Sequence, residues 1–579
     1  MRLAALALDY DGTLAANGVL EPDARAALEA VRESGVAIVL VTGRILSNLR
    51  SVAGDLRFAD GIVAENGAVV AFPQTGTTQL LARPPAASFV AELQKRRIPF
   101  EAGQCVVEAD SVHAALMLGI IRRHELPLVL IFNGGRVMVL PQGVSKASGL
   151  HVALRSLRLS EHNTLGIGDA ENDHSLLEAC EEGLAVEWGS AALKAAADRL
   201  VPGAGPSDAA AFLREMAKRP AIRPGSLRGH PVVLGETQRG TPVSLNLGDT
   251  NLLIVGDSVS GKSWAAGLIA EQWMQQHYSV CVIDPEGDYR ALANMPGAVY
   301  QGGEIKPPAI PALVSILSEP QLSAVVDLSQ VKASVKQMYV PALLGRLLEL
   351  RQRTGHPHRI IMDEAHYFLG DGTCASFPDF DAGGYVFVTY RFADIAPKVR
   401  PAHSAMISTR LTRPREVAAV LEFAGESASR TALAPVLRDL SIGEAILITP
   451  SAEGLRNPCQ FRLAPRRTGH VRHRIKYLNI PVPNGKGFVF TENGRPTGDK
   501  ADTVRDLAVL IRGIGDSILA GHLGRGDISR WIADVYIDQA LAGDIRGLER
   551  VYHYESLSDV RKALALLIED RYAAGDAPM

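Results

Sequence analysis

Apolar strand patterns alternate with amphipathic helix patterns along the first 220 residues. The apolar run LAALALDY precedes the helical pattern EPDARAALEAVRESG, and the apolar run VAIVLVTG follows it. Apolar runs that alternate with helical patterns indicate parallel strands joined by crossover helices. We therefore predict a doubly wound α/β domain with a parallel sheet over 1–220.

The alternation restarts after MAKRPAIRPGSLRGHP (216–231), whose Pro, Arg and Gly content is typical of a linker. The strand pattern NLLIVGD, the helix pattern SWAAGLIAEQWMQQH and the strand pattern SVCVIDP open a second α/β unit. RIIMDEAHYFL, YVFVTYR and EAILITP continue it, so we expect a second parallel-sheet domain over 221–455. The remainder, 456–579, predicts a basic linker and a small, mainly helical C-terminal domain.

Length and charge narrow the possible functions. The chain of 579 residues is long enough for roughly three or four domains. Its net charge of −3 gives no global polybasic signature, so a nucleic-acid partner would need a local basic patch. The five cysteines are scattered without a CxxC pair, which argues against a zinc site or a disulfide framework. Since no apolar run approaches the roughly 20 residues of a membrane helix, we expect a soluble, cytoplasmic protein with no membrane partner.

Four carboxylates follow predicted strands in the first domain. Asp9 ends the first strand and Asp11 comes two residues later in DYDGT, while GIGDAENDH supplies Asp169 and Asp173. Two carboxylates so placed can divide the chemistry of phosphate removal. Asp9 can attack phosphorus, and Asp11 can protonate the leaving oxygen and later activate water. Carboxylates that lie close together need a cation to offset their negative charge, and Mg²⁺ binds oxygen ligands.

Two further residues of the first domain can hold a phosphate. Thr42, in LVTGR, ends another predicted strand and offers a hydroxyl. Lys146, in GVSKASGL, offers a positive charge that offsets the nucleophile and the phosphate. The four motifs DYDGT, VTGR, VSKASGL and GDAEND therefore stand in order along one predicted sheet.

In these motifs the chain resembles the haloacid dehalogenase (HAD) superfamily over nearly all of 1–215. The resemblance implies a Rossmann-like fold and a Mg²⁺-dependent phosphatase with an aspartyl-phosphate intermediate. It makes Asp9 the nucleophile and a metal ligand, and Asp11 the general acid and base that also offers its main-chain carbonyl to the metal. Asp169 is then a direct ligand, and Asp173 is a further ligand or positions one. Thr42 and Lys146 hold the phosphate.

The sequence between these motifs resembles one branch of the superfamily. AENGA (64–68) is similar to the sugar- and glycolate-phosphatase branch, and residues of about 82–142 look like that branch's inserted α+β cap. The cap is short, as in phosphoglycolate phosphatases. The partner implied is a phosphomonoester substrate, whose identity the cap decides and the sequence leaves open.

The second domain opens with a phosphate-binding loop. Gly256, Gly261, Lys262 and Ser263 form G-x-x-x-x-G-K-S between a predicted strand and a predicted helix. The glycines let backbone N–H groups point at phosphates, Lys262 neutralises β/γ charge, and Ser263 binds Mg²⁺. The motif predicts ATP as the cofactor, together with Mg²⁺.

The strand pattern RIIMDEAHYFL supplies the acidic half of the same site. Asp363 can hold Mg²⁺ through water, and Glu364 can activate the attacking water. With VIDPEGDY and VFVTYR, this domain resembles the HerA/FtsK-type branch of RecA-like P-loop ATPases. The resemblance places Asp284 among the nucleotide-binding residues. It makes Arg391 and Arg410 candidate arginine fingers, although each is equally an ordinary salt-bridge residue.

The same resemblance implies a homo-oligomer, such as a hexameric ring, because such ATPases complete each site with an arginine from a neighbour. The chain departs from the branch in several places. Glu286 stands where His is usual, and Tyr390 replaces a polar sensor. No β-barrel precedes the loop, because the first domain occupies that space. The span between Tyr289 and Asp363 is also short. The missing barrel and this short span put DNA translocation in doubt and leave ATP hydrolysis in place.

A basic stretch follows the second domain and is the one local candidate for nucleic acid. It could neutralise the phosphates of DNA or RNA, and the alternative is a solvated linker. Its basic residues are Arg456, Arg462, Arg466, Arg467, Arg472, Arg474 and Lys476.

Four functions stay open on the sequence alone. The first is a bifunctional enzyme, a HAD phosphatase with an oligomeric HerA-like ATPase that acts on nucleic acid. The second is a phosphatase for phosphoglycolate or a sugar phosphate, with a regulatory ATPase module and no DNA role. The third is polynucleotide kinase/phosphatase-like end processing, against which Glu364 beside Asp363 argues because that pair activates water. The fourth is a nucleotide-dependent scaffold, against which the intact Asp9, Asp11 and Lys262 argue.

Overall fold

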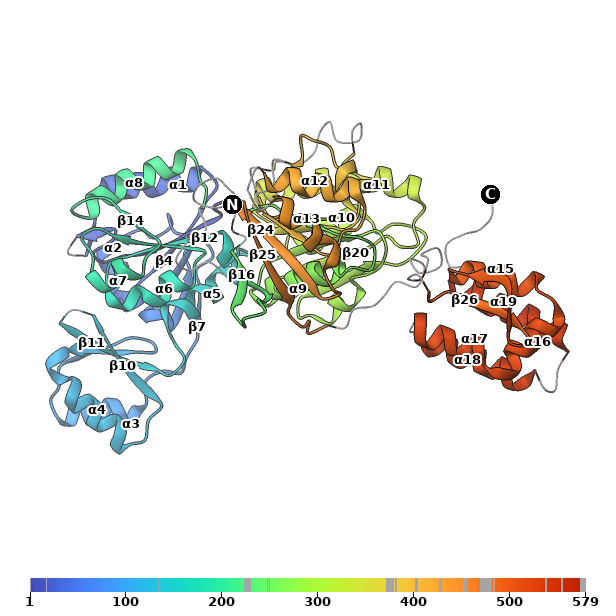
Figure 1. The fold of residues 1–579 in the computed structure, drawn as a ribbon. Coiled ribbons are helices and arrows are strands. Elements are labelled where there is room, and N and C mark those ends of the chain that lie inside the picture. The colour runs from blue at the N-terminus through green and yellow to red at the C-terminus, as the bar shows by residue number, and fades with distance from the viewer. Residues whose placement is uncertain are drawn as a thin grey trace.

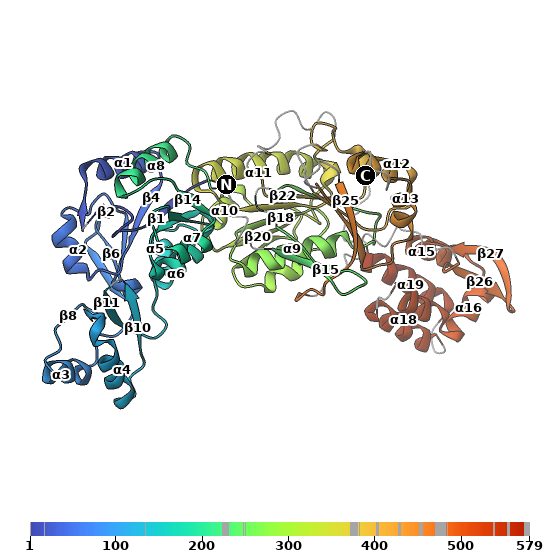
Figure 2. The ribbon, with the colours of Figure 1, turned by 60° about the vertical axis from the view of Figure 1, so that its left-hand side comes forward.

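The computed structural model has two adjoining α/β domains and a smaller helical domain on the far side of the second one (Figures 1 and 2). The structure describes residues 2–572 with gaps. The gaps are 17, 134, 223–230, 247, 249, 371–379, 381–382, 401–404, 426–429, 451–455, 469–481, 483–484, 537–538 and 553–555. Half of the expected linker 216–231, residues 223–230, therefore lies outside the described residues.

The first domain is a doubly wound α/β sheet, as predicted. Its strands have the order β14-β13-β12-β1-β4-β5-β6-β7, with all but β6 and β7 parallel. Apolar residues of α1, α2 and α8 pack on one face and those of α5, α6 and α7 on the other. The strands are β1 (Ala5–Asp9), β4 (Ala37–Val41), β5 (Gly61–Ala64), β6 (Val69–Phe72), β7 (Thr77–Leu80), β12 (Thr164–Gly168), β13 (Glu182–Val186) and β14 (Arg199–Val201). The helices are α1 (Pro22–Glu33), α2 (Leu46–Ala53), α5 (Lys146–Ser156), α6 (His174–Glu178), α7 (Ala191–Ala196) and α8 (Pro206–Lys218). A short hairpin, β2 (Ala15–Ala16) and β3 (Val19–Leu20), follows β1.

The segment expected to be a cap forms a separate lobe below this sheet (Figure 1). It is a four-stranded antiparallel sheet of order β10-β11-β9-β8, with two helices on one face. Phe89, Met117 and Ile120 belong to an apolar core of its own. The elements are α3 (Ala87–Lys95), β8 (Phe100–Ala102), β9 (Val107–Asp110), α4 (Ala114–Arg123), β10 (Leu128–Asn133) and β11 (Arg136–Pro141).

The second domain has the predicted parallel sheet, extended by antiparallel strands. Its order is β16-β15-β25-β24-β23-β17-β22-β21-β18-β20-β19, and the strands from β23 to β19 are parallel. Helix α9 covers one face and α10 to α13 the other. The strands are β15 (Val232–Glu236), β16 (Pro242–Leu245), β17 (Leu252–Val255), β18 (Val280–Asp284), β19 (Ala298–Gly302), β20 (Ser323–Asp327), β21 (Arg359–Met362), β22 (Tyr385–Thr389), β23 (Ala405–Ser408), β24 (Glu444–Pro450) and β25 (Arg456–Leu463). The helices are α9 (Lys262–Gln275), α10 (Ile310–Leu317), α11 (Ala333–Thr354), α12 (Pro414–Ala424) and α13 (Arg430–Asp439).

This domain continues past residue 455, where the sequence analysis ended it. Strand β25 pairs along its length with β24 and also joins β15. Beyond it, Arg466 Nε donates to Glu271 Oε1 at 2.8 Å, and the amide of Arg467 donates to Glu271 Oε2 at 2.8 Å. The Arg466 side chain is fully buried in this ion pair. Strand pairing and a buried carboxylate therefore make the first half of the basic stretch part of the fold, and residues 469–476 of that stretch lie outside the described residues.

The C-terminal domain is mainly helical, as predicted. A hairpin and five helices enclose their own apolar core. His522 joins the two parts, because Nε2 accepts the Thr491 amide at 2.9 Å and Nδ1 donates to Asp527 Oδ2 at 2.8 Å. Within the described residues, no helix has the length and apolar character needed to span a bilayer. The elements are β26 (Phe488–Glu492), β27 (Arg495–Ala501), α15 (Val504–Gly513), α16 (Asp516–Arg525), α17 (Asp527–Trp531), α18 (Gln539–Val551) and α19 (Leu557–Tyr572).

A buried polar network joins the two α/β domains. The Tyr278 hydroxyl donates to both carboxylate oxygens of Glu181, at 3.1 and 3.0 Å. The His162 ring stacks on Tyr278, and its nitrogens face Glu181 Oε2 at 2.7 Å and the Gln276 carbonyl at 2.6 Å. His162 lies just before β12, and Tyr278 lies just before β18. The domains therefore meet at the amino ends of these two strands.

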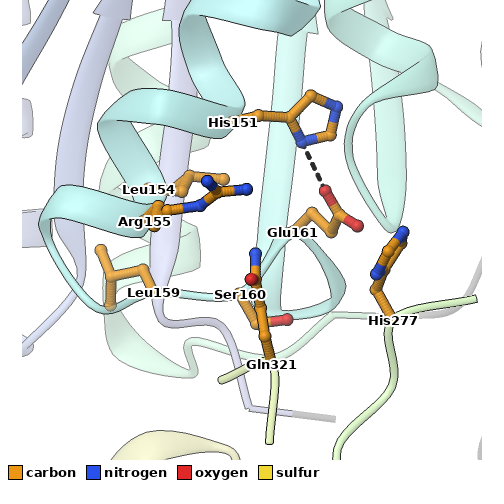
Figure 3. A pocket seen from close by; sticks show the side chains of 8 residues that line it. All are labelled: His151, Leu154, Arg155, Leu159, Ser160, Glu161, His277 and Gln321. Atoms are coloured by element: carbon orange, nitrogen blue, oxygen red, sulfur yellow. Dashed lines mark ion pairs between the residues drawn. The ribbon is translucent and has the colours of Figure 1, made fainter. Parts of the chain in front are cut away.

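A small cavity of about 20 Å³ lies at the same junction. Figure 3 shows the ion pair of His151 and Glu161, 2.6 Å apart, facing His277 and Gln321 of the second domain. Because the junction uses the amino ends of the parallel strands, the carboxyl edges of both sheets stay available for chemistry.

Candidate active sites

The carboxyl edge of the first sheet brings three of the predicted residues into contact. Lys146 Nζ, at the start of α5, donates to Asp9 Oδ1 at 2.6 Å and to Asp173 Oδ1 at 2.5 Å. All three side chains are at most 7% exposed. Burial alone would lower the pKa of Lys146, but the attraction of Asp173 and Asp9 outweighs it and the pKa is raised. Lys146 is therefore charged and holds both carboxylates in place.

Asp169 completes a cluster of three carboxylates at this edge. Oxygens of Asp9, Asp169 and Asp173 lie within 4.8 Å of one another. Burial, followed by repulsion from Asp173, raises the pKa of Asp9 well above its usual value and that of Asp169 to about 6. Three acids beside one lysine leave negative charge uncompensated, which is the condition for a divalent cation with oxygen ligands.

Asp173 has the least freedom to bind a further ion. Its Oδ2 accepts the amides of Asp169 and Ala170 at 3.1 and 3.0 Å, while Oδ1 accepts from Lys146. Asp169 Oδ1 accepts the Thr13 hydroxyl at 3.2 Å. The contacts of Asp173 thus orient Asp169 and Lys146.

Asp11 lies on the other side of Asp9 and is held by an arginine. Arg44 Nε and Nη2 donate to the two oxygens of Asp11 at 2.5 and 2.7 Å, and Arg44 Nη1 donates to Asn48 at 2.7 Å. The Thr42 hydroxyl oxygen, at the end of β4, accepts the Arg44 amide at 3.1 Å. Arg44 is the last residue of the VTGR motif, and its role follows from this contact and not from the motif.

A cavity of about 290 Å³ extends from these carboxylates to the cap. Glu65, from the AENGA stretch, fixes the cap at its rim, because its buried carboxylate accepts the amides of Gln104 and Cys105 at 2.9 and 2.8 Å. The residues lining the cavity are Asp9, Asp11, Thr42, Gly43, Arg44, Ile45, Asn48, Glu101, Glu108, Arg136, Met138, Asp169, Ala170 and Asn172.

The phosphate-binding loop of the second domain joins β17 to α9 and is rigidly braced. A side chain at Gly256 would lie 1.8 Å from Thr409 Oγ1, and Gly261 has φ +107°, so both positions need glycine. Lys262 Nζ donates to the Asp257 carbonyl of its own loop at 2.8 Å. The loop backbone is therefore fixed in shape, while Lys262 is held by a carbonyl of the loop.

A second acidic turn faces this loop from β18. Ser263 Oγ donates to Asp288 Oδ2 at 2.8 Å. The Asp284 carboxylate instead accepts amides of its own turn, those of Glu286, Gly287, Asp288 and Tyr289, at 2.7–3.2 Å. Burial, then repulsion from Asp288, raises the pKa of Asp284 well above its usual value. Asp284 shapes the turn that presents Asp288, a residue to which the sequence analysis gave no role.

Asp363 and Glu364 follow β21, which β22 separates from the strand of the phosphate-binding loop. Asp363 Oδ1 accepts the Glu364 amide at 2.8 Å, and Glu364 has the left-handed φ of +46°. Glu364 Oε2 lies 3.6 Å from His366 Nδ1, which also contacts Thr389 Oγ1 at 3.1 Å. Burial lowers the pKa of His366 to about 4, so this ring is neutral beside the carboxylate.

The two arginines predicted as fingers differ in position. The main-chain carbonyl of Arg410 accepts the amide of Asp257, so Arg410 lies beside the loop of its own chain. Arg391 is half exposed, 4.0 Å from Asp394, with its guanidinium 5.3 Å from the Tyr390 ring centre. Lys262 Nζ lies 5.9 Å from the same ring. Tyr390 thus occupies the place between the loop lysine and Arg391.

Known families match both domains. The model of haloacid dehalogenase-like hydrolases matches residues 6–114 and 100–205, and that of the central domain of helicase HerA matches 232–310. A phosphoglycolate phosphatase of Halorubrum lacusprofundi is 32% identical over 209 residues, which are 34% of this chain and 89% of that protein. A phosphoglycolate phosphatase of Archaeoglobus fulgidus is 28% identical over 225 residues, 36% of this chain and 96% of that protein.

Solved structures match a similar share of the chain. A haloacid dehalogenase-like hydrolase from Bacteroides thetaiotaomicron has a TM-score of 0.32 and 16% identity, and it covers 37% of this chain and 100% of that one. A sugar phosphatase of HAD subclass IIB has the same TM-score and 20% identity, and it covers 37% of this chain and 98% of that one. Through its first domain the chain belongs to the haloacid dehalogenase-like hydrolases, and that domain is fused to one similar to the central domain of helicase HerA.

Proposed function

We propose that the chain is a bifunctional hydrolase, a Mg²⁺-dependent phosphomonoesterase at Asp9 and an ATPase at Lys262. The observation that carries the first activity is the buried Lys146, which bridges Asp9 and Asp173 at an edge that also presents Asp169. This arrangement holds a nucleophilic carboxylate beside a fixed positive charge, as attack on a phosphate ester requires.

The first site supplies each step of phosphate ester hydrolysis. Asp9 attacks phosphorus, which forms an Asp9–phosphorus bond as the ester bond breaks, and Asp11 gives its proton to the leaving oxygen. The Asp11 carboxylate then takes a proton from water, and the hydroxide attacks phosphorus, breaks its bond to Asp9 and releases inorganic phosphate. Arg44 binds both oxygens of Asp11, so one of these hydrogen bonds opens when Asp11 carries the proton and the other keeps the side chain in position. Lys146 stabilises the charge on the phosphate, and the Thr42 hydroxyl donates to one of its oxygens.

The same edge fits a magnesium ion. Asp9 and Asp169 supply carboxylate oxygens and Asp11 a main-chain carbonyl, and these hard oxygen ligands are those that Mg²⁺ prefers. When bound, the ion offsets the negative charge of the phosphate and the carboxylates. Asp173 keeps its role of positioning Asp169 and Lys146.

At the second site, the loop amides and Lys262 bind the phosphates of ATP. Ser263 and Asp363 hold the magnesium ion that accompanies the nucleotide, and Glu364 takes a proton from the attacking water. Lys262 and Ser263 now contact Asp257 and Asp288, so both side chains turn toward the nucleotide when it binds. Because Arg410 lies beside its own loop, it is the candidate for an arginine supplied within one chain, and Arg391 is the candidate for one supplied to a neighbour in an oligomer.

The substrate of the first site is a small phosphomonoester. The cap closes one end of a cavity of about 290 Å³, which favours a small molecule over a polynucleotide end. The relatives named phosphoglycolate phosphatases point to the same size of substrate. A nucleic-acid role would need the positive charge of the basic stretch 456–476. Within that stretch, Glu271 already neutralises Arg466. The proposal therefore comprises a separate ATPase and no nucleic-acid substrate.

Trapping the covalent intermediate tests the phosphatase half. The chain is mixed with p-nitrophenyl phosphate and Mg²⁺, quenched in acid and reduced with borohydride, which converts an aspartyl phosphate into homoserine. Peptide mass spectrometry should find homoserine at position 9 and not in an EDTA control. Rapid hydrolysis without any such product would refute Asp9 as the nucleophile.

A further inference from the structure

The cap end of the phosphatase cavity carries more negative than positive charge. Glu101 and Glu108 are directly opposite each other on β8 and β9, so both side chains lie on one face of the cap sheet. Met138 of β11 is opposite Glu108, and Arg136, two residues earlier, shares that face. All four residues line the cavity that contains Asp9.

Both arginines that line the cavity already have carboxylate partners. Arg136 Nε donates to Glu108 Oε1 at 2.7 Å. Arg44 donates to both oxygens of Asp11. Glu101 makes no hydrogen bond or ion pair with any residue that the structure describes, and it is exposed to the cavity. Among the described lining residues, a second acidic group of a substrate would thus find its two possible cations engaged and a carboxylate close by.

We propose that the cap selects phosphate esters of neutral, hydroxyl-bearing alcohols, namely sugar or polyol phosphates, and discriminates against esters that carry a second acid, such as phosphoglycolate. The inference rests on the proposed phosphatase function and names its substrate class. Hydroxyl groups donate to Glu101 and to the remaining acceptor sites of Glu108, and hydrogen bonds to a charged acceptor are the strong ones. A substrate carboxylate in the same place meets the like charge of Glu101, and it competes with Glu108 for Arg136.

The size of the cavity agrees with this class. Its volume of about 290 Å³ lies at the small end of ligand pockets, which run from roughly 300 to 1,000 Å³. One sugar or polyol unit fits such a space. Discrimination by polar groups is also sharper than discrimination by size, because an unpaired buried charge costs more than a missing methylene contact.

A matched set of substrates tests the proposal on the intact protein. The value of kcat/KM is measured for 2-phosphoglycolate, 2-hydroxyethyl phosphate, 2-aminoethyl phosphate and ribose 5-phosphate, with p-nitrophenyl phosphate as a generic substrate. The first two substrates differ at one group only, since 2-phosphoglycolate has a carboxylate where 2-hydroxyethyl phosphate has a hydroxymethyl group. We expect 2-hydroxyethyl phosphate to exceed 2-phosphoglycolate by about tenfold or more, and ribose 5-phosphate to be best. Equal or better turnover of 2-phosphoglycolate overturns the inference, and so does a preference for the cationic 2-aminoethyl phosphate.

Two variants test the assigned residues. Glu108→Gln releases Arg136 and should raise kcat/KM for 2-phosphoglycolate about tenfold while lowering that for ribose 5-phosphate. Glu101→Gln should also lower the ratio of kcat/KM for ribose 5-phosphate to kcat/KM for 2-phosphoglycolate, but without releasing an arginine. Glu125→Gln, an equal loss of charge on an exposed cap residue that does not line the cavity, should leave the ratio as in the wild type.

Failure of the inferred cap selectivity can be told apart from failure of the phosphatase function. An unchanged ratio in both Glu108→Gln and Glu101→Gln overturns the inference about the cap and leaves the phosphatase intact. If the wild-type protein hydrolyses none of the substrates, p-nitrophenyl phosphate included, the phosphatase function itself is refuted and the inference with it.

Discussion

Replacing Lys146 by methionine should destabilise the first domain, because two buried carboxylates share that one cation. Lys146 Nζ is 2.6 Å from Asp9 and 2.5 Å from Asp173, and neither carboxylate is more than 7% exposed. Removing one partner of a buried ion pair typically costs about 3–5 kcal/mol, since the charge left behind has neither water nor a counter-ion. Methionine has a similar length, so little of the loss arises from packing.

The size of this loss should depend on pH. Burial already raises the pKa of Asp9, and loss of the lysine raises it further, so a proton replaces the missing charge more readily as the pH falls. In EDTA we expect the free energy of unfolding to fall by about 3 kcal/mol at pH 8 and by clearly less at pH 5. Hydrogen exchange of the β1 and β12 amides, followed by mass spectrometry, should then be roughly 100-fold faster at pH 8 than in the wild type.

Lys218→Met is the matched control. Lys218 pairs with Glu215 on the surface, where the side chains are 69% and 74% exposed, and such a pair contributes about 0–1 kcal/mol. If exchange in Lys146→Met equals exchange in Lys218→Met at both pH values, the buried bridge does not stabilise the site and the reasoning is refuted.

Three further predictions test other parts of the structure. The pKa of Asp169 is raised to about 6 from 3.8, so the folded chain keeps a proton that the unfolded chain loses. In EDTA, urea unfolding of the first domain should therefore show a free energy that falls by up to about 3 kcal/mol as pH rises from about 4 to 7, and a flat or rising curve would contradict this. Arg44→Met frees Asp11 and should lower kcat for p-nitrophenyl phosphate about 10–100-fold with little change in KM, and an unchanged kcat would exclude a positioning role. Tyr278→Phe removes the bifurcated hydrogen bond that the hydroxyl donates to buried Glu181, so exchange in β12 and β18 should speed up by an amount equal to about 1–3 kcal/mol. Unchanged exchange would mean that this hydrogen bond adds no stability.

Much of the fold follows from local sequence patterns. Apolar runs separated by amphipathic helices were enough to predict two parallel sheets, because each strand is buried on both faces and each helix on one. The end of the second domain was misplaced because β25 has the Arg and Pro content of a linker. Its place in the sheet depends on pairing with β24 and β15, and the sequence does not show that partnership.

The candidate sites also contain some residues that the sequence predicts and others that it does not. Asp9 and Asp169 were predictable because their motifs follow parallel strands, whose carboxyl ends meet at one edge. Lys146 follows the antiparallel cap strand β11, and it was predictable only from the order of the four motifs. The roles of Arg44 and Asp288 were not, since each depends on a partner that only the folded chain supplies, Asp11 or Ser263.

The junction between the two α/β domains also could not be predicted from the sequence. His162 and Tyr278 lie in different domains and have ordinary surroundings in the sequence. Only the structure shows that they stack on each other beside Glu181. A contact between two domains leaves no periodic pattern in either one, so no local rule could have found it.

The independence of the two sites is the central claim, and crossed variants test it most directly. Phosphate release from p-nitrophenyl phosphate and from ATP is measured, each with Mg²⁺, for the wild type, Asp9→Asn and Glu364→Gln. We expect Asp9→Asn to abolish hydrolysis of the ester and to leave ATP hydrolysis within about twofold, and Glu364→Gln to do the reverse. Loss of both activities in either single variant would contradict two separate active sites in one chain.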